Sequence, residues 1–240
     1  MIKGVSFDAA GTLLVNRYHP GKFARDCANS CGIAVTDPEE AAYVRIFKDR
    51  LAAFWTANQT RSEAALRDYW LDLTRDWLAE IGEDTNCAKA ICAEGERQLL
   101  ESDSWFEPYD DVEPAINLLV SLDLPVFVLS NWDLSLHRIL RAKIPNHSFA
   151  LTIASLEEGY EKPDPRIFHV LCARANLAPD EIIHIGDSWG DDVEGALCAG
   201  IHAGFVDRTI NQVASREMAG DRMLIRGATL PAIIEAALCS

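Results

Sequence analysis

The sequence predicts an α/β protein with a Rossmann-like parallel sheet core and an inserted block of helices. Between residues 108 and 240, short apolar runs alternate with helical segments, which is the pattern of right-handed βαβ units. One more apolar run lies near residue 1, and only helical patterns occur between it and residue 108. We therefore expect a core domain of residues 1–15 and 108–240 and an inserted helical domain of residues 16–107.

The first expected strand is Ile2–Phe7, a short apolar run that ends in the tight loop Asp8–Thr12. Four helical patterns then follow without an intervening strand. The second opens with Asp37 as N-cap and Pro38 at the first helical position, and its apolar stripe continues as one helix as far as Trp55. The four helices are expected at about 22–31, from 37 onward, near 62–82 and at about 87–100.

In the second half of the chain, each of four apolar runs follows a helical segment and is expected to form a strand of the sheet. The four runs are Val126–Leu129, Phe149–Ile153, Ile182–Ile185 and Ala203–Val206. The helices before them are expected at about 112–122, at about 134–142, from 164 onward and at about 191–199. A short edge strand at Met223–Ile225 and a closing helix at Leu230–Cys239 complete the expected core.

The chain has 240 residues and a formal net charge of -15 at pH 7, from 22 Lys and Arg against 37 Asp and Glu. This balance argues against a general nucleic-acid binder or an anionic membrane surface, because both need clustered Lys and Arg. The first residues do not resemble a signal peptide, and no apolar run is long enough to span a bilayer. The seven cysteines lack zinc-site spacing, so we expect reduced thiols in a soluble, cytoplasmic protein.

Ligands of an open parallel sheet bind beyond the carboxyl ends of its strands, so the polar residues at those ends are the candidates for function. They are Asp8, Gly11 and Thr12 after the first strand, Ser130 and Asn131 after the second, Lys162 in the loop beyond the third, and Asp187, Asp191 and Asp192 after the fourth. We expect these segments, which are far apart in the sequence, to meet at one end of the sheet.

This set of side chains suits a magnesium ion and a phosphoryl group. Mg²⁺ prefers hard oxygen ligands and commonly takes one or two carboxylates together with substrate phosphate. Asp8 could be a metal ligand, a nucleophile that forms an aspartyl-phosphate, or both. Lys162 would neutralise charge on the transferred group, and Ser130 would orient its oxygens.

Four segments that carry these residues resemble the four motifs of the haloacid dehalogenase (HAD) superfamily, in order and at plausible spacing. They are Phe7-Asp8-Ala9-Ala10-Gly11-Thr12-Leu13, Val128-Leu129-Ser130-Asn131, Glu161-Lys162-Pro163-Asp164-Pro165 and Gly186-Asp187-Ser188-Trp189-Gly190-Asp191-Asp192. The resemblance covers the whole core. The insert after the first motif is similar to the helical C1 cap of subfamily I. The resemblance implies a HAD-like fold and a hydrolase.

The resemblance also implies roles for the matching residues, with Mg²⁺ as cofactor and a small phosphorylated metabolite as substrate. The residues implied for catalysis are Asp8 as nucleophile, Ser130 and Lys162. Those implied for binding the phosphoryl group are Gly11, Thr12, Ser130, Asn131 and Lys162. Those implied for holding the metal are Asp8, Asp187, Asp192 (directly or through water) and Ala10 through its backbone carbonyl.

One position departs from the pattern of the family's phosphatases. These usually carry a second Asp two residues after the nucleophile, as acid and base, where this chain has Ala10. Losing a general acid/base typically costs about 10²- to 10⁴-fold in rate. We therefore expect a slow or specialised magnesium phosphatase, which relies on good leaving groups or on another acid.

Two alternatives stay open. The first is a different hydrolysis reaction on the same fold. A phosphonatase-like hydrolase would form a Schiff base through a cap lysine, and Lys48 lies at a roughly suitable place in the chain. A dehalogenase-like hydrolase would not keep the carboxylates of Asp187 and Asp192. The other alternative is a catalytically weak module that binds a phospho-ligand or a protein. His184, in an expected buried strand, is interpreted as a hydrogen-bonded core histidine.

Overall fold

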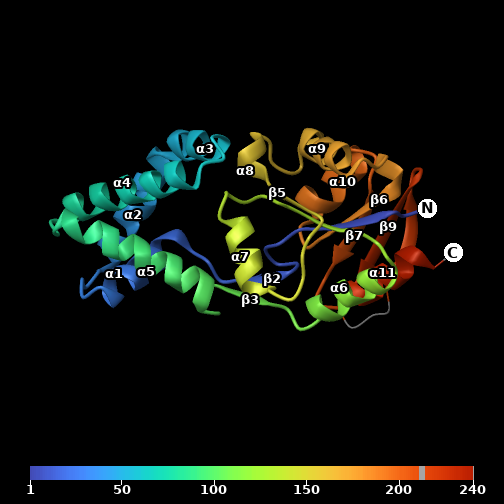
Figure 1. The fold of residues 1–240 in the computed structure, drawn as a ribbon, viewed down its shortest axis with the longest axis horizontal. Helices are drawn as coiled ribbons and strands as arrows, with labels where there is room; N and C mark the ends of the chain where they lie inside the picture. The colour runs from blue at the N-terminus through green and yellow to red at the C-terminus, as the bar shows by residue number, and fades with distance from the viewer. Residues whose placement is uncertain (211–213, 240) are drawn as a thin grey trace. The chain divides into compact units, whose positions relative to one another are not determined.

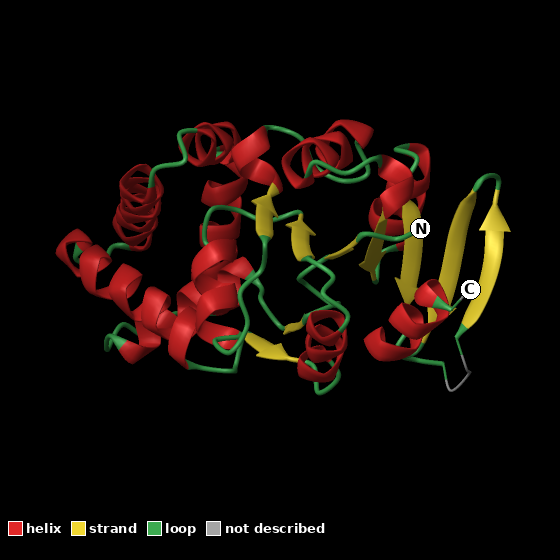
Figure 2. Cartoon of the chain, turned by 45° about the vertical axis from the view of Figure 1, so that its right-hand side comes forward, coloured by secondary structure: helices red, strands yellow, loops and turns green. Residues whose placement is uncertain are grey.

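The computed structural model of this chain describes residues 1–210 and 214–239 and comprises two compact units. The first consists of Met1–Val15, Pro108–Asp133 and Ile144–Ser240, and the second of Asn16–Glu107 and Leu134–Lys143. The first unit holds the large sheet, and the second is mainly helical (Figures 1 and 2). The predicted α/β fold with a parallel sheet is confirmed.

Within the described residues, the first unit forms a seven-stranded sheet in the order β5-β4-β1-β6-β7-β9-β8. In chain order these strands are β1 (Gly4–Phe7), β4 (Val126–Ser130), β5 (Leu151–Ala154), β6 (Ile182–Gly186), β7 (His202–Val206), β8 (Ser215–Ala219) and β9 (Arg222–Gly227). Neighbouring strands run parallel except for β8 and β9, which are antiparallel.

Strand β1 lies inside the sheet, between β4 and β6, and all four of its residues are buried. The chain extends the sheet from β1 to β4 and β5 on one side, and later to β6 and β7 on the other. The strand order therefore reverses around β1, and such a switch point is where open α/β sheets bind their ligands. In register, Phe7 pairs with both Val128 and Ile185, so the three strands end close together.

Helices cover both faces of this sheet, with α9 and α10 on one face and α6 and α11 on the other (Figure 1). Successive residues of a strand alternate between the two faces. Ala203 of β7 accordingly packs in a cluster with Phe168 of α9, whereas a Cβ atom at Gly204 would meet Ile233 of α11 at 2.9 Å. These helices are α6 (Val112–Ser121), α9 (Pro165–Ala175), α10 (Gly195–Cys198) and α11 (Leu230–Leu238).

The expected edge strand at Met223–Ile225 is not at the edge. It forms the middle of β9, which pairs with β7 on one side and with β8 on the other. Strand β8 reads Ser-Arg-Glu-Met-Ala and is largely exposed, so it lacks the apolar signal that predicts the other strands. A hairpin through Gly220, whose φ of 62° is in the left-handed region, brings β8 beside β9.

The second unit is built mainly of helices. They are α1 (Pro20–Ser30), α2 (Asp37–Asp49), α3 (Leu51–Gln59), α4 (Glu63–Ile81), the 3₁₀ turn η1 (Thr85–Cys87), α5 (Ala88–Glu101) and α7 (Leu136–Lys143). The short strands β2 (Leu14–Asn16) and β3 (Phe106–Pro108), in which the chain passes between the two units, pair as a separate sheet.

Two details of this unit differ from the sequence prediction. The N-cap of α2 is Thr36 rather than Asp37, because Glu39 accepts hydrogen bonds from the Thr36 amide and hydroxyl. The helix expected to continue to Trp55 is divided at Arg50 into α2 and α3. This division lets Phe47 and Phe54 both pack on the ring of Trp70 in α4.

Helix α7 lies in the part of the chain that we assign to the core from the sequence, but its contacts place residues 134–143 in the helical unit. The amide of Leu134 donates to Asn58 Oδ1, Arg138 pairs with Glu96, and Lys143 Nζ donates to the carbonyl of Ser102. Among the described residues, no helix has both the length and the apolar character that crossing a membrane requires.

Candidate active site

The carboxyl ends of β1, β4 and β6 bring together most of the polar residues that the sequence pattern indicates. Asp8 directly follows β1, Ser130 is the last residue of β4, and Asp187 directly follows β6. Lys162 reaches the same place from the loop between the short helix α8 (Ser155–Glu158) and α9. Asp164 caps α9 by accepting from the Arg166 amide, which fixes where that loop ends.

The carboxylate of Asp8 is the centre of the cluster. Its Oδ1 accepts hydrogen bonds from Ser130 Oγ at 2.8 Å and from Lys162 Nζ at 2.6 Å. Burial raises the pKa of Asp8 above its ordinary value, and the charge of Lys162 only partly offsets this effect. Ser130 and Lys162 both donate to Oδ1, so their hydrogen bonds leave the other carboxylate oxygen of Asp8, Oδ2, available for chemistry.

Lys162 joins two carboxylates. Its buried ammonium donates to Asp8 Oδ1 at 2.6 Å and to Asp192 Oδ1 at 2.5 Å. Burial by itself would lower the pKa of Lys162, but the two carboxylates outweigh burial and raise it. Lys162 is therefore a fixed positive charge between Asp8 and Asp192.

Asn131 holds the backbone of Lys162. Its Nδ2 donates to the Lys162 carbonyl at 2.9 Å, and its Oδ1 accepts from the Lys162 amide at 2.8 Å. Both polar ends of the Asn131 side chain are thus engaged by the protein. Asn131 therefore positions Lys162, and the second N–H of Nδ2 stays available for the phosphoryl group, so the expected contact of Asn131 with that group stays a prediction.

Asp192 is held on both of its carboxylate oxygens. Oδ1 accepts from Lys162 Nζ and lies 3.1 Å from His184 Nε2, and Oδ2 accepts from the Ser188 amide at 2.9 Å. Burial acts to raise the pKa of Asp192, but Lys162 and His184 prevail and lower it. The carboxylate fills the space beside Gly186, where a Cβ atom would lie 2.1 Å from it.

Asp187 is set by the loop that follows β1. Thr12 Oγ1 donates to Asp187 Oδ1 at 3.1 Å, and a Cβ atom at Gly11 would lie 2.2 Å from the same carboxylate. Gly11 also has a φ of +87°, so both space and conformation require glycine there. Partial burial of the Asp187 carboxylate raises its pKa, and Asp192 adds repulsion. Gly11 and Thr12 thus position the carboxylate of Asp187, and their binding of the phosphoryl group stays a prediction.

The backbone of Ala10 lies in a tight turn, where it pairs with Leu14 in an isolated parallel bridge. The Gly11 amide donates to the Leu14 carbonyl at 2.7 Å, and the Leu14 amide donates to the Ala9 carbonyl at 2.8 Å. Neither of these bonds uses the Ala10 carbonyl, whose role toward a metal stays a prediction. The methyl side chain of Ala10 can neither donate nor accept a proton.

The carboxylates of this site fit a divalent cation. Asp8, Asp187 and Asp192 each offer one oxygen, and these oxygens all lie within 4.8 Å of one another. Lys162 pairs with two of these three carboxylates, those of Asp8 and Asp192, so the cluster carries excess negative charge that a cation would offset. An all-oxygen donor set is the kind that Mg²⁺ prefers.

Three residues support this site although the sequence pattern does not assign them to it. Ser6 Oγ lies 3.0 Å from Nδ1 of His184, which in turn contacts Asp192, and Arg208 donates to the Thr12 carbonyl at 2.8 Å. His184 is fully buried with both ring nitrogens in hydrogen bonds, as expected for a core histidine. The sequence signals two of these residues, because each is a polar residue within an otherwise apolar strand: Ser6 in the first expected strand and His184 in the fourth.

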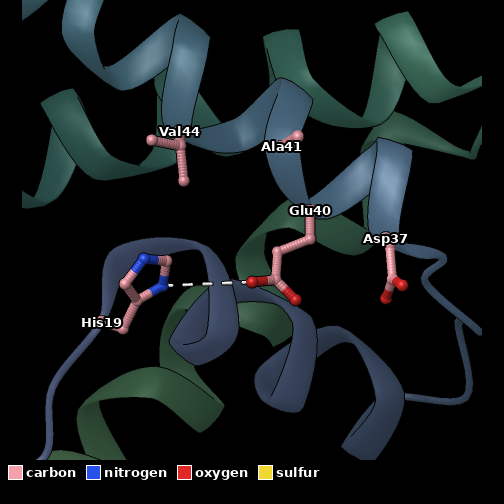
Figure 3. Close-up of a pocket in the computed structure, with 5 residues that line it drawn as sticks. All are labelled: His19, Asp37, Glu40, Ala41 and Val44. Carbon is pink, nitrogen blue, oxygen red and sulfur yellow. Dashed lines mark ion pairs between the residues drawn. The ribbon is translucent and has the colours of Figure 1, made fainter.

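The helical unit contains a separate cavity of about 310 Å³, lined by His19, Asp37, Glu40, Ala41 and Val44 (Figure 3). Its acidic side chains are paired, because Arg25 contacts both Asp37 and Glu40. It includes none of the residues at the strand ends. Lys48, which the phosphonatase alternative requires, is exposed on α2.

Comparison with known proteins gives consistent matches. The sequence model of the haloacid dehalogenase-like hydrolases matches residues 2–200. Haloacid dehalogenase-like hydrolase domain-containing protein 3 of Bos taurus is 29% identical over 205 residues, which cover 83% of this chain and 79% of the relative. Glyceraldehyde 3-phosphate phosphatase of Methanopyrus kandleri is 25% identical over 216 residues, covering 84% and 82%.

A solved structure matches the whole fold. The 2-haloacid dehalogenase from Pseudomonas syringae pv. Tomato DC3000 aligns with a TM-score of 0.67 and 22% identity, over 99% of this chain and 98% of that chain. At this identity the similarity concerns the fold, and the residues of the site must indicate the chemistry.

Proposed function

Because this chain belongs to the haloacid dehalogenase-like hydrolases, we propose that it is a magnesium-dependent phosphatase that uses Asp8 as its nucleophile. The observation that carries the proposal is the ammonium of Lys162 between Asp8 and Asp192, with the hydroxyl of Ser130 on the same oxygen of Asp8. The phosphatase from Methanopyrus kandleri among its relatives supports a small phosphorylated molecule as substrate. We further propose that the helical unit is a C1 cap.

In the proposed reaction, Asp8 Oδ2 forms a bond to phosphorus while the bond from phosphorus to the ester oxygen breaks. Lys162 and Ser130 hold Oδ1, so Oδ2 is the attacking oxygen. The ester oxygen leaves with the bonding electron pair and takes a proton from water. A water molecule then attacks the aspartyl-phosphate at phosphorus, which releases inorganic phosphate and restores the Asp8 carboxylate.

Asp8, Asp187 and the Ala10 carbonyl would hold Mg²⁺, with Asp192 contributing directly or through water. The bound ion would neutralise charge on the phosphoryl oxygens. Lys162 remains at its place between Asp8 and Asp192 throughout, and it adds a second positive charge where negative charge is transferred.

The carboxylate cluster favours a phosphatase over a dehalogenase or a phosphonatase. A dehalogenase of this family would not need the carboxylates of Asp187 and Asp192, yet this chain fixes Asp187 through Thr12 and Asp192 through Ser188. A phosphonatase would need a reactive lysine in the cap, and Lys48 is an exposed residue of a helix.

The direct test is hydrolysis of p-nitrophenyl phosphate by the purified full chain. We expect turnover with Mg²⁺, loss of turnover with EDTA, and recovery when excess Mg²⁺ is added. Asp187→Asn should need a higher Mg²⁺ concentration for half-maximal rate. Chloride release from 2-chloropropionate without phosphate release would indicate a dehalogenase. Phosphate binding by calorimetry without any turnover would indicate a binding module, and either result would overturn the proposal.

Substitution of Ala10 tests whether a general acid at this position is the one catalytic group that the site lacks. Ala10→Asp should raise kcat/KM for alkyl phosphates by about tenfold or more, because an alkoxide needs a proton to leave. The gain should be small for p-nitrophenyl phosphate, whose phenolate leaves without one. Ala10→Asn is the matched control of equal size without an acid. Equal effects of the two substitutions would contradict an acid/base role for this position.

A further inference from the structure

We propose that His184 is a positioning residue of this site: its ring holds Asp192 in the orientation that keeps the ammonium of Lys162 on Asp8. The proposal rests on the proposed function, and it assigns a task to a buried histidine that the sequence indicates only as part of the core. It also assigns a task to Ser6, the residue on the other side of the ring.

The position of His184 follows from the sheet. His184 of β6 and Ser6 of β1 are register partners on neighbouring parallel strands. Their side chains meet at 3.0 Å between Ser6 Oγ and His184 Nδ1. An edge-to-face contact with Phe168 of α9 fixes the ring plane, with centroids 5.3 Å apart and an interplanar angle of 80°. His184 is 0% exposed, so its ring does not contact solvent.

The partners of the ring define which nitrogen carries the proton. Asp192 Oδ1 lies 3.1 Å from His184 Nε2 and already accepts from Lys162, so the ionised carboxylate can only accept from the ring. The contact with Asp192 therefore requires a proton on Nε2. In the neutral ring Nδ1 is then an acceptor, and the hydroxyl of Ser6 donates to it. Ser6, His184, Asp192 and Lys162 thus form one connected chain of hydrogen bonds that ends on Asp8.

This chain matters because Asp192 Oδ1 is shared by two donors. Lys162 reaches it at 2.5 Å and reaches Asp8 Oδ1 at 2.6 Å, so a small rotation of the Asp192 carboxylate would draw the ammonium away from Asp8. The Ser188 amide holds only Oδ2. Apart from Lys162 itself, the N–H of His184 is therefore the second donor that holds the Asp192 carboxylate. Its hydrogen bond to Oδ1 resists rotation of the carboxylate about the Cβ–Cγ bond of Asp192.

Two substitutions of His184 separate positioning from filling of space. His184→Gln keeps an N–H donor at the distance of Nε2, whereas His184→Met fills a similar volume without a donor. His184→Met should lower kcat/KM about 10- to 100-fold, the usual cost of losing a residue that orients a group of the site. His184→Gln, which keeps the donor, should have a kcat/KM within about threefold of that of wild type.

His202 provides a matched control in the neighbouring strand β7. It is also buried with both ring nitrogens in hydrogen bonds, to the Asp180 carbonyl and from the Met223 amide, and it contacts none of the site residues. His202→Met should lower the melting temperature as His184→Met does, but it should leave kcat/KM unchanged. Equal loss of kcat/KM in the two variants, or no rescue by a folded His184→Gln protein, would overturn the proposal.

Two further measurements do not depend on turnover. In wild-type protein with ¹⁵N-labelled histidine, NMR should show a proton on Nε2 of His184, and a ring protonated on Nδ1 but not on Nε2 would overturn the proposal. Calorimetric titration with Mg²⁺ alone should show weaker binding in His184→Met than in His202→Met, and equal affinities would also overturn it. A wild type with the expected ring and Mg²⁺ binding but no hydrolysis would contradict the proposed function while supporting the positioning role.

Discussion

Replacing Asp8 by Asn should reduce kcat for p-nitrophenyl phosphate by at least about 10⁴-fold, because removal of a catalytic nucleophile commonly has an effect of this size. Asn has the shape of Asp but cannot form a covalent bond to phosphorus under these conditions. The substitution also removes one of the three carboxylates proposed to hold the metal. Both effects act in the same direction, so we expect the loss of rate to exceed that of any other single substitution in the site.

The loss should not come from unfolding. Burial raises the pKa of Asp8, which means that its charged form is costly in the folded protein, so a neutral Asn should be tolerated. Lys162 would keep its bond to Asp192. Asp191→Asn is the matched control: it removes a carboxylate next to Asp192 in the same short helix (η3, Trp189–Glu194), outside the three-carboxylate cluster, and should change kcat by less than about threefold.

The covalent step can be examined separately. Acid quenching during turnover should trap an acyl-phosphate on wild-type protein, detected by mass spectrometry and removed by hydroxylamine. Asp8→Asn protein should show no such adduct. Turnover of Asp8→Asn at more than a tenth of the wild-type rate, or an adduct on another residue, would show that hydrolysis does not proceed through Asp8.

The alternation of apolar runs and helices was enough to predict the parallel sheet, because each buried strand carries a continuous apolar signal. The same reasoning placed Asp8, Ser130, Lys162 and Asp187 at one end of it, and the structure brings these side chains together. The rule that ligands bind at the carboxyl ends of strands depends only on topology, and therefore it needs no knowledge of side-chain geometry.

Other features depend on contacts between side chains that no periodicity encodes. Strand β8 is exposed and polar, so only its hairpin with β9 makes it a strand. The two hydrogen bonds of the Asn131 side chain with the backbone of Lys162 join residues 31 positions apart, and no pattern in the sequence indicates them. Ser6 and His184 meet across 178 positions of sequence, and their pairing follows from the register of β1 and β6.

Replacing Lys162 by Met should produce the second largest effect, and it should appear in stability as well as in rate. Lys162 is 4% exposed, and its removal would leave Asp8 and Asp192 buried without a cation. Removing one partner of a buried ion pair costs about 3–5 kcal/mol in the free energy of unfolding. We expect a loss of this size in urea unfolding followed by circular dichroism at neutral pH in EDTA.

The dependence of this loss on pH and Mg²⁺ identifies its cause. Without Lys162, repulsion and burial would raise the pKa of the two carboxyls in the folded protein above the unfolded values. A raised carboxyl pKa destabilises the folded state above the unfolded pKa, so the loss should shrink as pH falls from about 7 to about 5. Mg²⁺ should also reduce it, because an ion that binds only the folded form stabilises that form.

Lys143 provides the matched control for Lys162→Met. It is also buried, but its single carboxylate partner, Asp103, is exposed and remains hydrated when the ammonium is removed. Lys143→Met should therefore cost only about 1 kcal/mol through the lost ion pair, with no response to Mg²⁺. Equal losses in the two variants, or a loss in Lys162→Met that neither acid nor Mg²⁺ reduces, would mean that Lys162 does not compensate buried carboxylate charge. The ammonium could then not be the group that prepares Asp8 for attack.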